Sequence, residues 1–144
     1  MGQLIHIGSD HGGFALKSRL SAILKQKGYE IDDLGTYSED SVDYPEQGKK
    51  VALAVLKDGN TGIIICGTGI GISIAANRFK GIRAALCHNV EYAKLSREHN
   101  NANILALGGR FLDDRSAEEI TDTFLKTEFL GGRHQRRVEL LDNI

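Results

Sequence analysis

The chain has 144 residues, of which 41% are hydrophobic and 26% charged, and its formal net charge at pH 7 is −1. This balance is ordinary for a globular protein and argues against a nucleic-acid partner, as do the absence of tryptophan and an aromatic content of 6%. No apolar run reaches the roughly 20 residues of a membrane span. Two cysteines, Cys66 and Cys87, in a sequence without a secretory leader predict reduced thiols and a cytoplasmic location.

The first half of the chain alternates between strand and helix patterns. In order, it predicts a strand, a helix, a weaker strand and a second helix, at residues 4–9, 14–24, 29–34 and 45–57. Gly28 ends the first helix, and Pro45 suits the first turn of the second. Residues 35–43 are polar and predict a loop between the weaker strand and that helix.

The second half continues the same alternation and ends in two helices. Its expected elements are a strand, a helix, a strand, a helix, a strand and two helices, at residues 63–65, 72–76, 82–87, 90–99, 103–107, 115–126 and 133–141. Strands joined by helices over short connections form parallel sheets covered on both faces. The sequence therefore predicts one α/β domain over residues 1–144, a three-layer α/β/α Rossmann-like fold with a five-stranded parallel sheet.

The glycine-rich stretch Cys66-Gly67-Thr68-Gly69-Ile70-Gly71 follows the third expected strand directly. Glycines let the backbone turn tightly and approach a ligand, and the helix that begins here presents unpaired N–H groups. The spacing G-x-G-x-G matches neither the dinucleotide fingerprint nor a phosphate loop that ends in Lys-Ser/Thr. The stretch indicates an anion site with the Cys66 thiol at its lip; the alternative is a packed turn around an inert cysteine.

A second glycine turn, Asp10-His11-Gly12-Gly13, follows the first expected strand. If strands one and three are neighbours, as in common doubly wound sheets, both turns meet at the carboxyl edge, where such sheets bind ligands. Asn100 and Arg110 flank the later strands, and the sequence leaves open which edges they occupy. His6 and His88 are isolated histidines, which we interpret as structural.

Arg133 and Arg137 are four residues apart in the last expected helix and so project from one face, which suits a phosphate. The alternative is a solvated helix end, with Arg136 facing solvent. A thiol, histidines and a phosphate clamp fit two chemistries: attack of Cys66 on a carbonyl, as in cysteine hydrolases, or proton abstraction beside a carbonyl with Cys66 as base. A metal site is poorly supported, because the cysteines are far apart and no histidine pair has helical ligand spacing.

Five separated motifs point to one family. They are Asp10-His11-Gly12-Gly13, Asp43-Tyr44-Pro45, the stretch from Cys66 to Asn77, Ser96-Arg97-Glu98-His99-Asn100, and the stretch from Gly131 to Val138. In these residues, and in their order over essentially the whole chain, the sequence closely resembles the B-type ribose-5-phosphate isomerases. That family also contains the galactose-6-phosphate and allose-6-phosphate isomerases.

The resemblance implies an aldose–ketose isomerase that interconverts D-ribose 5-phosphate and D-ribulose 5-phosphate through an enediolate. Cys66 would be the base, Thr68 and the backbone of the glycine turn would stabilise the enediolate, and His99 would pass a proton during ring opening. Some members use a glutamate in the following helix instead of the cysteine, but here that region reads Ala75-Ala76. The groups implied to contact the substrate are Asp10, His11, Gly67, Gly69, Ile70, Gly71, Asn100, Arg110, Arg133 and Arg137.

The resemblance further implies a homodimer or homotetramer whose active sites combine residues of two subunits, with the helix at about 133–141 contacting a partner. It implies no metal and no organic cofactor. A six-carbon substrate, allose 6-phosphate or galactose 6-phosphate, stays an alternative, because the loop at residues 38–42 does not reveal the pocket length. An alternative of another class is a non-catalytic sugar-phosphate-binding module, which would keep the glycines but would not need Cys66.

Overall fold

The computed structural model describes residues 2–144 and contains one five-stranded sheet, in which all neighbouring strands are parallel. The strand order is β2-β1-β3-β5-β4. The strands are β1 (Leu4–Ser9), β2 (Glu30–Asp33), β3 (Thr61–Cys66), β4 (Ala84–Leu86) and β5 (Ile104–Gly108). The predicted parallel sheet is confirmed, and so is the expected pairing of the first and third strands, which places the reversal of winding between them.

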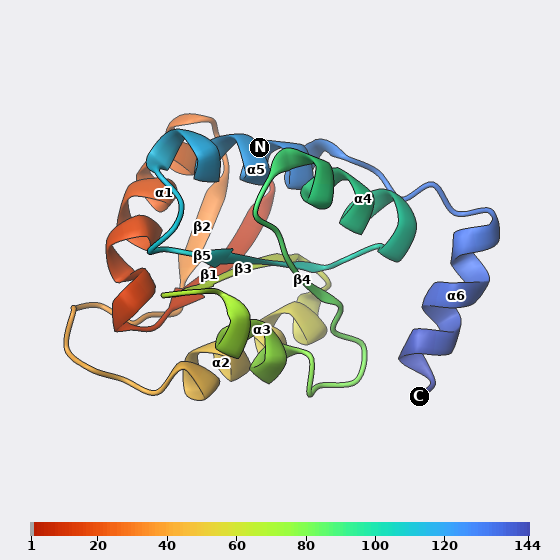
Figure 1. Ribbon diagram of the computed structural model, residues 1–144, viewed down its shortest axis with the longest axis horizontal. Helices are drawn as coiled ribbons and strands as arrows, with labels where there is room; N and C mark the ends of the chain where they lie inside the picture. Colours follow the sequence, from red (N-terminus) through yellow and green to blue (C-terminus); the bar gives the residue numbers. More distant parts are fainter. Residues whose placement is uncertain (1) are drawn as a thin grey trace.

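Helices cover both faces of the sheet and form the predicted three layers (Figure 1). They are α1 (Phe14–Gln26), α2 (Tyr44–Asp58), α3 (Ile70–Ala76), α4 (Val90–Asn100), α5 (Asp114–Lys126) and α6 (Arg133–Asp142), with a short 3₁₀ turn, η1 (His11–Gly13), before α1. α1, α4 and α5 share one hydrophobic cluster with the sheet, and α2 and α3 share the other. None of the helices described within residues 2–144 combines the length and the apolar character needed to cross a bilayer.

The isoleucine run of β3 supplies both clusters, because side chains alternate between the faces of a strand. Ile63 and Ile65 pack beneath α1 and α5, whereas Ile64 packs beneath α2 and α3, and all three side chains are fully buried. Each such side chain stabilises the fold by roughly 1.5–3 kcal/mol. The strand that carries Cys66 is therefore fixed from both sides.

β4 is shorter than the predicted strand over residues 82–87, because side-chain amides replace ladder hydrogen bonds. The N–H of Arg83 donates to the side chain of Asn103, at 2.8 Å, and the N–H of Ala84 donates to the side chain of Asn77, also at 2.8 Å. The N–H of Ile82 bonds to the carbonyl of Phe79, at 3.0 Å. The chain therefore enters the sheet two residues later than the apolar run suggests.

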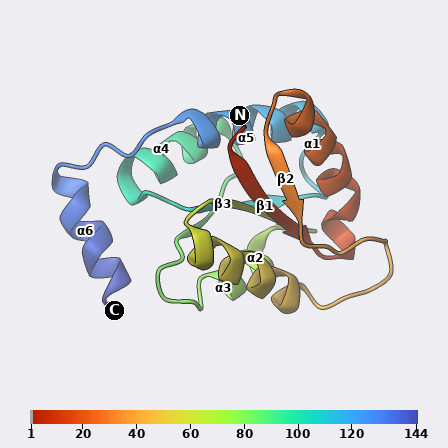
Figure 2. The same ribbon diagram turned by 180° about the vertical axis from the view of Figure 1, so that it is seen from behind.

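α6 stands apart from the layers and packs against α4 (Figures 1 and 2). Its buried side chains are His134 and Val138, while the neighbouring arginines are exposed. In both views, α6 lies at the far end of the molecule from η1 and the start of α1.

Candidate active site

Three turns meet at the carboxyl edge of the sheet, after β1, β3 and β5. The N–H of Asp10 donates to the carbonyl of Ile65, at 3.2 Å, which joins the first turn to the second. The N–H of Gly109 donates to the carbonyl of Cys66, at 2.8 Å, and that of Arg110 to the carbonyl of Gly67, at 3.0 Å. The two glycine turns of the sequence are therefore neighbours, as predicted, and the turn after β5 joins them.

Two glycines are required by this close approach. Gly69 has φ 78° and ψ −13°, and a Cβ there would lie 2.6 Å from Leu86 Cδ1. A Cβ on Gly13 would lie 2.4 Å from the carbonyl oxygen of Ile65, well inside van der Waals contact. Since only glycine lacks a Cβ and readily adopts positive φ, these residues fix the spacing between the turns.

The Cys66 thiol lies at the end of β3 and is 4% exposed. It lies deeper than the predicted position at the lip of the turn, because its side chain packs with the apolar cluster beneath α2 and α3. Its Sγ accepts a hydrogen bond from the N–H of Gly69, at 3.1 Å. Such a donor stabilises negative charge on sulfur.

Some N–H groups of the glycine turn donate to side chains of the turn itself, and others have no protein acceptor within the described residues. Gly69 donates to the thiol, and Ile70 donates to Oγ1 of Thr68, at 3.1 Å. Within residues 2–144, the N–H groups of Gly67 and Thr68 have no protein acceptor. The glycine turn therefore uses two donors to hold its own side chains and leaves these two N–H groups without a protein partner in the described part of the chain.

Cys87 is the second thiol and differs from the first in its surroundings. It is 1% exposed, and burial raises its pKa to about 11. A thiol with that pKa stays protonated at neutral pH and is unsuited to act as a base or nucleophile. Of the two cysteines, Cys66 is therefore the candidate for chemistry.

Asp10 and His11 are held by the backbone around them. Oδ1 of Asp10 accepts the N–H of Gly13, at 3.1 Å, and so caps η1. Nδ1 of His11 accepts the N–H of Val42, at 3.1 Å, from the loop that precedes α2. Both side chains thus belong to the carboxyl edge of the sheet, beside the glycine turn.

The Arg110 side chain lies over the glycine turn. A Cβ on Gly67 would lie 3.1 Å from Arg110 Nε, so the guanidinium occupies the space that a larger residue would fill. Within the described residues, the Arg110 side chain forms no ion pair. The carboxyl edge therefore combines a thiol, open N–H groups and a cation.

Gly71 lies in the first turn of α3, at the carboxyl edge, whereas the other predicted residues lie at the opposite edge. α4 runs back from the carboxyl edge and ends at Asn100, whose carbonyl accepts from Arg83 Nε, at 3.1 Å, just before β4 begins. β5 spans five residues, so the two edges are roughly 15 Å apart along the strands. His99 and Asn100 therefore lie far from Cys66 within one chain.

His99 stacks on His134 of α6, with ring centroids 4.3 Å apart and an interplanar angle of 14°. Burial, together with the nearby His99, Arg133 and Arg137, lowers the pKa of His134. Arg133 and Arg137 are exposed and form no ion pair within residues 2–144. The structure thus gathers His99, His134 and the two arginines into one cluster at the edge opposite Cys66.

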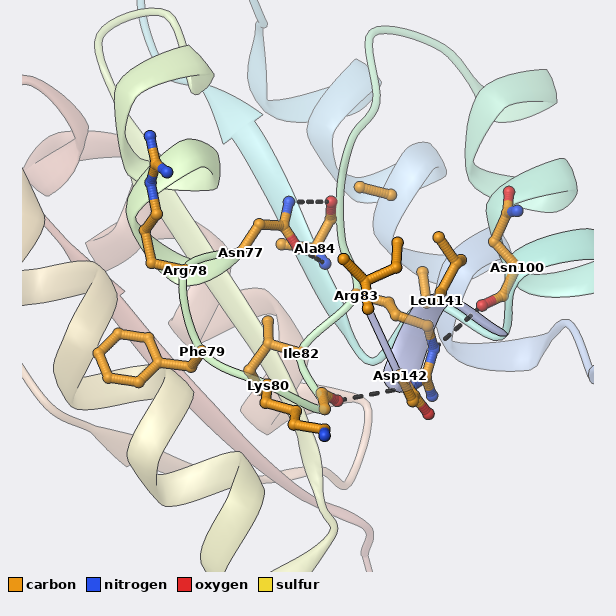
Figure 3. A pocket seen from close by; sticks show the side chains of 14 residues that line it. Asn77, Arg78, Phe79, Lys80, Ile82, Arg83, Ala84, Asn100, Leu141 and Asp142 are labelled. Atoms are coloured by element: carbon orange, nitrogen blue, oxygen red, sulfur yellow. Dashed lines mark hydrogen bonds and ion pairs between the residues drawn. The ribbon is translucent and has the colours of Figure 1, made fainter. Parts of the chain in front are cut away.

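A cavity of about 630 Å³ lies between α6 and the start of β4, near this cluster (Figure 3). The Arg83 guanidinium, which lines this cavity, is paired with Asp142: its Nη1 lies 2.8 and 2.9 Å from the two carboxylate oxygens. Asn100 is the predicted site residue that lines it. Within residues 2–144, no group of three or more His, Cys, Asp or Glu side chains is placed to hold a metal ion.

Sequence reasoning missed several supporting groups. His134 lies inside a motif that carried the resemblance, but its stacking on His99 depends on the packing of α6 against α4. Lys17 is 1% exposed and pairs with Asp33. The available signal was the spacing of Lys17 from Leu20 and Leu24, which places the lysine on the buried face of the helix. A buried lysine needs an anionic partner, so this spacing predicts an ion pair.

Comparisons with known proteins point to one family. A sequence profile of the ribose/galactose isomerase family matches residues 5–141. Ribose-5-phosphate isomerase B of Escherichia coli K12 is 48% identical over 141 residues, which cover 97% of this chain and 95% of that protein.

Solved structures give the same result. Ribose-5-phosphate isomerase B from Clostridium thermocellum is 55% identical and superposes with a TM-score of 0.96, over 98% of this chain and 96% of that chain. The enzyme from Mycoplasma genitalium, solved with bound ribulose-5-phosphate, is 44% identical with a TM-score of 0.94, over 99% and 96% of the two chains. The chain described here therefore belongs to the ribose/galactose isomerase family.

Proposed function

We propose that this protein interconverts D-ribose 5-phosphate and D-ribulose 5-phosphate. Its family and its relatives, which are ribose-5-phosphate isomerases of type B, support an aldose–ketose isomerase. The observation that carries the proposal for this chain is the carboxyl edge itself. There, the Cys66 thiol accepts a backbone N–H beside two open N–H groups and the Arg110 guanidinium.

In the proposed reaction, Cys66 acts as the general base on the open-chain aldose. The thiolate takes the proton from C2, and the electron pair of that bond forms the C1–C2 double bond while negative charge moves to O1. The proton then returns from sulfur to C1, and a proton passes from O2 to O1, which gives the ketose. A base of this kind typically contributes 10²–10⁴-fold to the rate.

The glycine turn is suited to the charge that develops on oxygen. The open N–H groups of Gly67 and Thr68, with the Arg110 cation above them, offer fixed donors near the thiol. Donors that are already in place cost no reorganisation during the reaction, and each typically contributes about 3–4 kcal/mol to the transition state. Asp10 and His11, next to this turn, would contact the sugar hydroxyls.

We propose that a second copy of the chain completes the site. His99 would pass the proton during ring opening, and Arg133 and Arg137 would bind the phosphate, but all three lie at the edge opposite Cys66. Two chains related by a two-fold axis would bring the opposite edges together twice, giving two equal sites. The exposed Ile70 and Ile74 on α3, each 51% exposed, supply apolar surface for such an interface.

Mixing two variants tests the shared site, with activity measured at a substrate concentration well below the wild-type KM, where both variants are nearly inactive. Cys66→Ala and Arg137→Ala damage different half-sites, so a mixed dimer regains one intact site. Random re-association of equal amounts is expected to restore about a quarter of the wild-type activity. Lack of recovery, with mixed dimers verified by mass spectrometry, would show that each chain works alone.

Substrate preference is tested by comparing kcat/KM for ribose 5-phosphate, allose 6-phosphate and galactose 6-phosphate. We expect the highest value for ribose 5-phosphate. A higher value for a six-carbon sugar would replace the proposed substrate with that one, and turnover of none would refute the isomerase proposal. We further propose a cytoplasmic location, a reducing compartment that suits the two free cysteines.

A further inference from the structure

The loop between β2 and α2 contacts the candidate site at a single, specific point. The N–H of Val42 donates to Nδ1 of His11, at 3.1 Å. A backbone N–H can only donate, so this hydrogen bond requires a lone pair on Nδ1. In a neutral imidazole the proton must then be on Nε2, and His11 can act as a hydrogen-bond donor through that nitrogen.

The start of the same loop is anchored by an ion pair between a buried lysine and an exposed aspartate. Nζ of Lys17, on α1, lies 2.7 Å from both carboxylate oxygens of Asp33, and the Lys17 side chain is 1% exposed. Oδ1 of Asp33 also accepts the N–H of Gly35, at 2.9 Å. The Tyr37 hydroxyl donates to the Asp33 carbonyl, at 3.0 Å, and its ring lies 5.6 Å from Lys17 Nζ.

The anchored segment is tied in turn to the strand that leads to His11. The N–H of Ser9 donates to the carbonyl of Gly35, at 2.7 Å, and the N–H of Thr36 donates to the carbonyl of Ser9, at 2.8 Å. Ser9 precedes Asp10 and His11 directly. The loop is therefore held at one end by the Lys17–Asp33 pair and contacts the His11 ring at the other, at the same end of the molecule as the start of α1 (Figures 1 and 2).

We propose that this loop is a positioning element that fixes His11 as the Nε2–H tautomer, and that Lys17 and Asp33 are the positioning residues that anchor it. In this arrangement His11 donates a hydrogen bond to an oxygen of the sugar phosphate and does not carry the proton of ring opening. The inference rests on the proposed function, because it takes His11 as a substrate contact. It also gives the buried Lys17 of α1 a role.

A matched pair of loop variants tests the tautomer. Val42→Pro removes the N–H, whereas Val42→Ala keeps it and changes only the side chain. Long-range proton–nitrogen correlations of ¹⁵N-histidine-labelled protein, at about pH 8, distinguish the two tautomers, with His11→Asn identifying the signals. In the wild type and in Val42→Ala, Nδ1 of His11 is expected to carry no proton. Val42→Pro is expected to show a mixture of both tautomers.

The same variants are compared in kcat/KM. Loss of one oriented donor to a charged ligand typically costs about ten-fold or more, so Val42→Pro is expected to lose that factor while Val42→Ala stays near wild type. A proton on Nδ1 of His11 in the wild type overturns the proposal. So does a Val42→Pro protein with an unchanged tautomer and unchanged kcat/KM.

Lys17→Met tests the anchor and serves if Val42→Pro does not fold. It keeps an unbranched side chain that is one atom shorter and removes its charge, and circular dichroism reports whether the fold persists. We expect the His11 signals to shift toward the mixture and kcat/KM to fall; wild-type signals and kinetics would refute the anchoring role. If no sugar phosphate is turned over but the His11 signals respond as expected, the proposed function fails and the positioning stands.

Discussion

The carboxyl and amino edges of the sheet carry different groups of predicted site residues and are built in different ways. At the carboxyl edge, backbone groups dominate: glycine turns after β1 and β3 abut, and their N–H groups donate to the short side chains of Cys66, Thr68 and Asp10. At the amino edge, side chains dominate. His99 and His134 stack where α4 ends and α6 begins, and Arg133 and Arg137, which form no ion pair within residues 2–144, lie near His134.

The difference shows how the chemistry is divided. Fixed backbone donors suit a charge that appears on oxygen during the reaction, because they do not move. Long cationic side chains suit a phosphate, which keeps its charge throughout and needs only to be bound. The carboxyl edge is therefore expected to control turnover and the amino edge to control affinity.

The largest effect is expected at the thiol. Cys66→Ala should lower kcat by about 10²–10⁴-fold, because it removes the general base, and should leave binding largely intact. Steady-state kinetics and calorimetric titration with ribose 5-phosphate measure the two effects. Cys87→Ala is the control, since that thiol is buried on the other face and should affect stability alone. Near-normal turnover by Cys66→Ala would exclude it as the base.

A smaller and different effect is expected at the amino edge. Arg137→Ala should raise KM by about 10–100-fold with little change in kcat, because it removes a charged hydrogen bond to the phosphate. Arg136→Ala, the exposed neighbour on another side of α6, is the matched control and should have a KM close to wild type. Equal effects of the two substitutions would argue for a diffuse positive field in place of a clamp.

The energetic cost of crowding in the glycine turn can be measured by comparing an alanine at Gly69 with an alanine at Gly131, before α6, whose surroundings are open. Gly69→Ala forces a Cβ against Leu86 at positive φ, whereas Gly131, with φ 67°, has open space around its Cβ position. Both Gly69→Ala and Gly131→Ala should lower the free energy of unfolding by about 1–2 kcal/mol, because alanine disfavours positive φ. Gly69→Ala should lower it further, because its Cβ is also crowded. Urea unfolding compares the two proteins, and equal losses would mean that the turn relaxes freely.

The smallest effect is a pH dependence of stability at the histidine stack. Burial and the neighbouring cations lower the pKa of His134 in the folded protein. As the pH falls, the His134 side chain is therefore protonated in the unfolded chain before it is protonated in the folded one. The free energy of unfolding should therefore decrease below about pH 6.5, and His134→Gln should flatten that decrease. Urea unfolding between about pH 5 and pH 8 measures both proteins. Parallel curves would contradict the lowered pKa.

Most of the fold follows from local patterns in the sequence. The alternation of apolar runs gave the sheet and its layers, and the β-branched Ile63, Ile64 and Ile65 are buried on both faces as a central strand should be. The β4 boundary was wrong because Asn77 and Asn103 capture backbone groups from a distance. No local pattern carries that information.

The candidate site was predicted in part. Topology alone brings Asp10 to Cys66, because the carboxyl ends of neighbouring parallel strands meet. The stack of His99 on His134 and the hydrogen bond from Val42 to His11 depend on tertiary packing of a helix and a loop. The family and its isomerase activity came from the five motifs read together, and the roles of individual residues stay predictions.

The distance between the edges has a consequence for how such an enzyme behaves in the test tube. If the two halves meet only when chains associate, turnover per chain depends on the amount of protein present. Below the dissociation constant of the pair, specific activity should fall on dilution and recover on concentration, by mass action. If enzyme from a very dilute stock is concentrated just before the assay, the progress curve should show a lag while the chains associate.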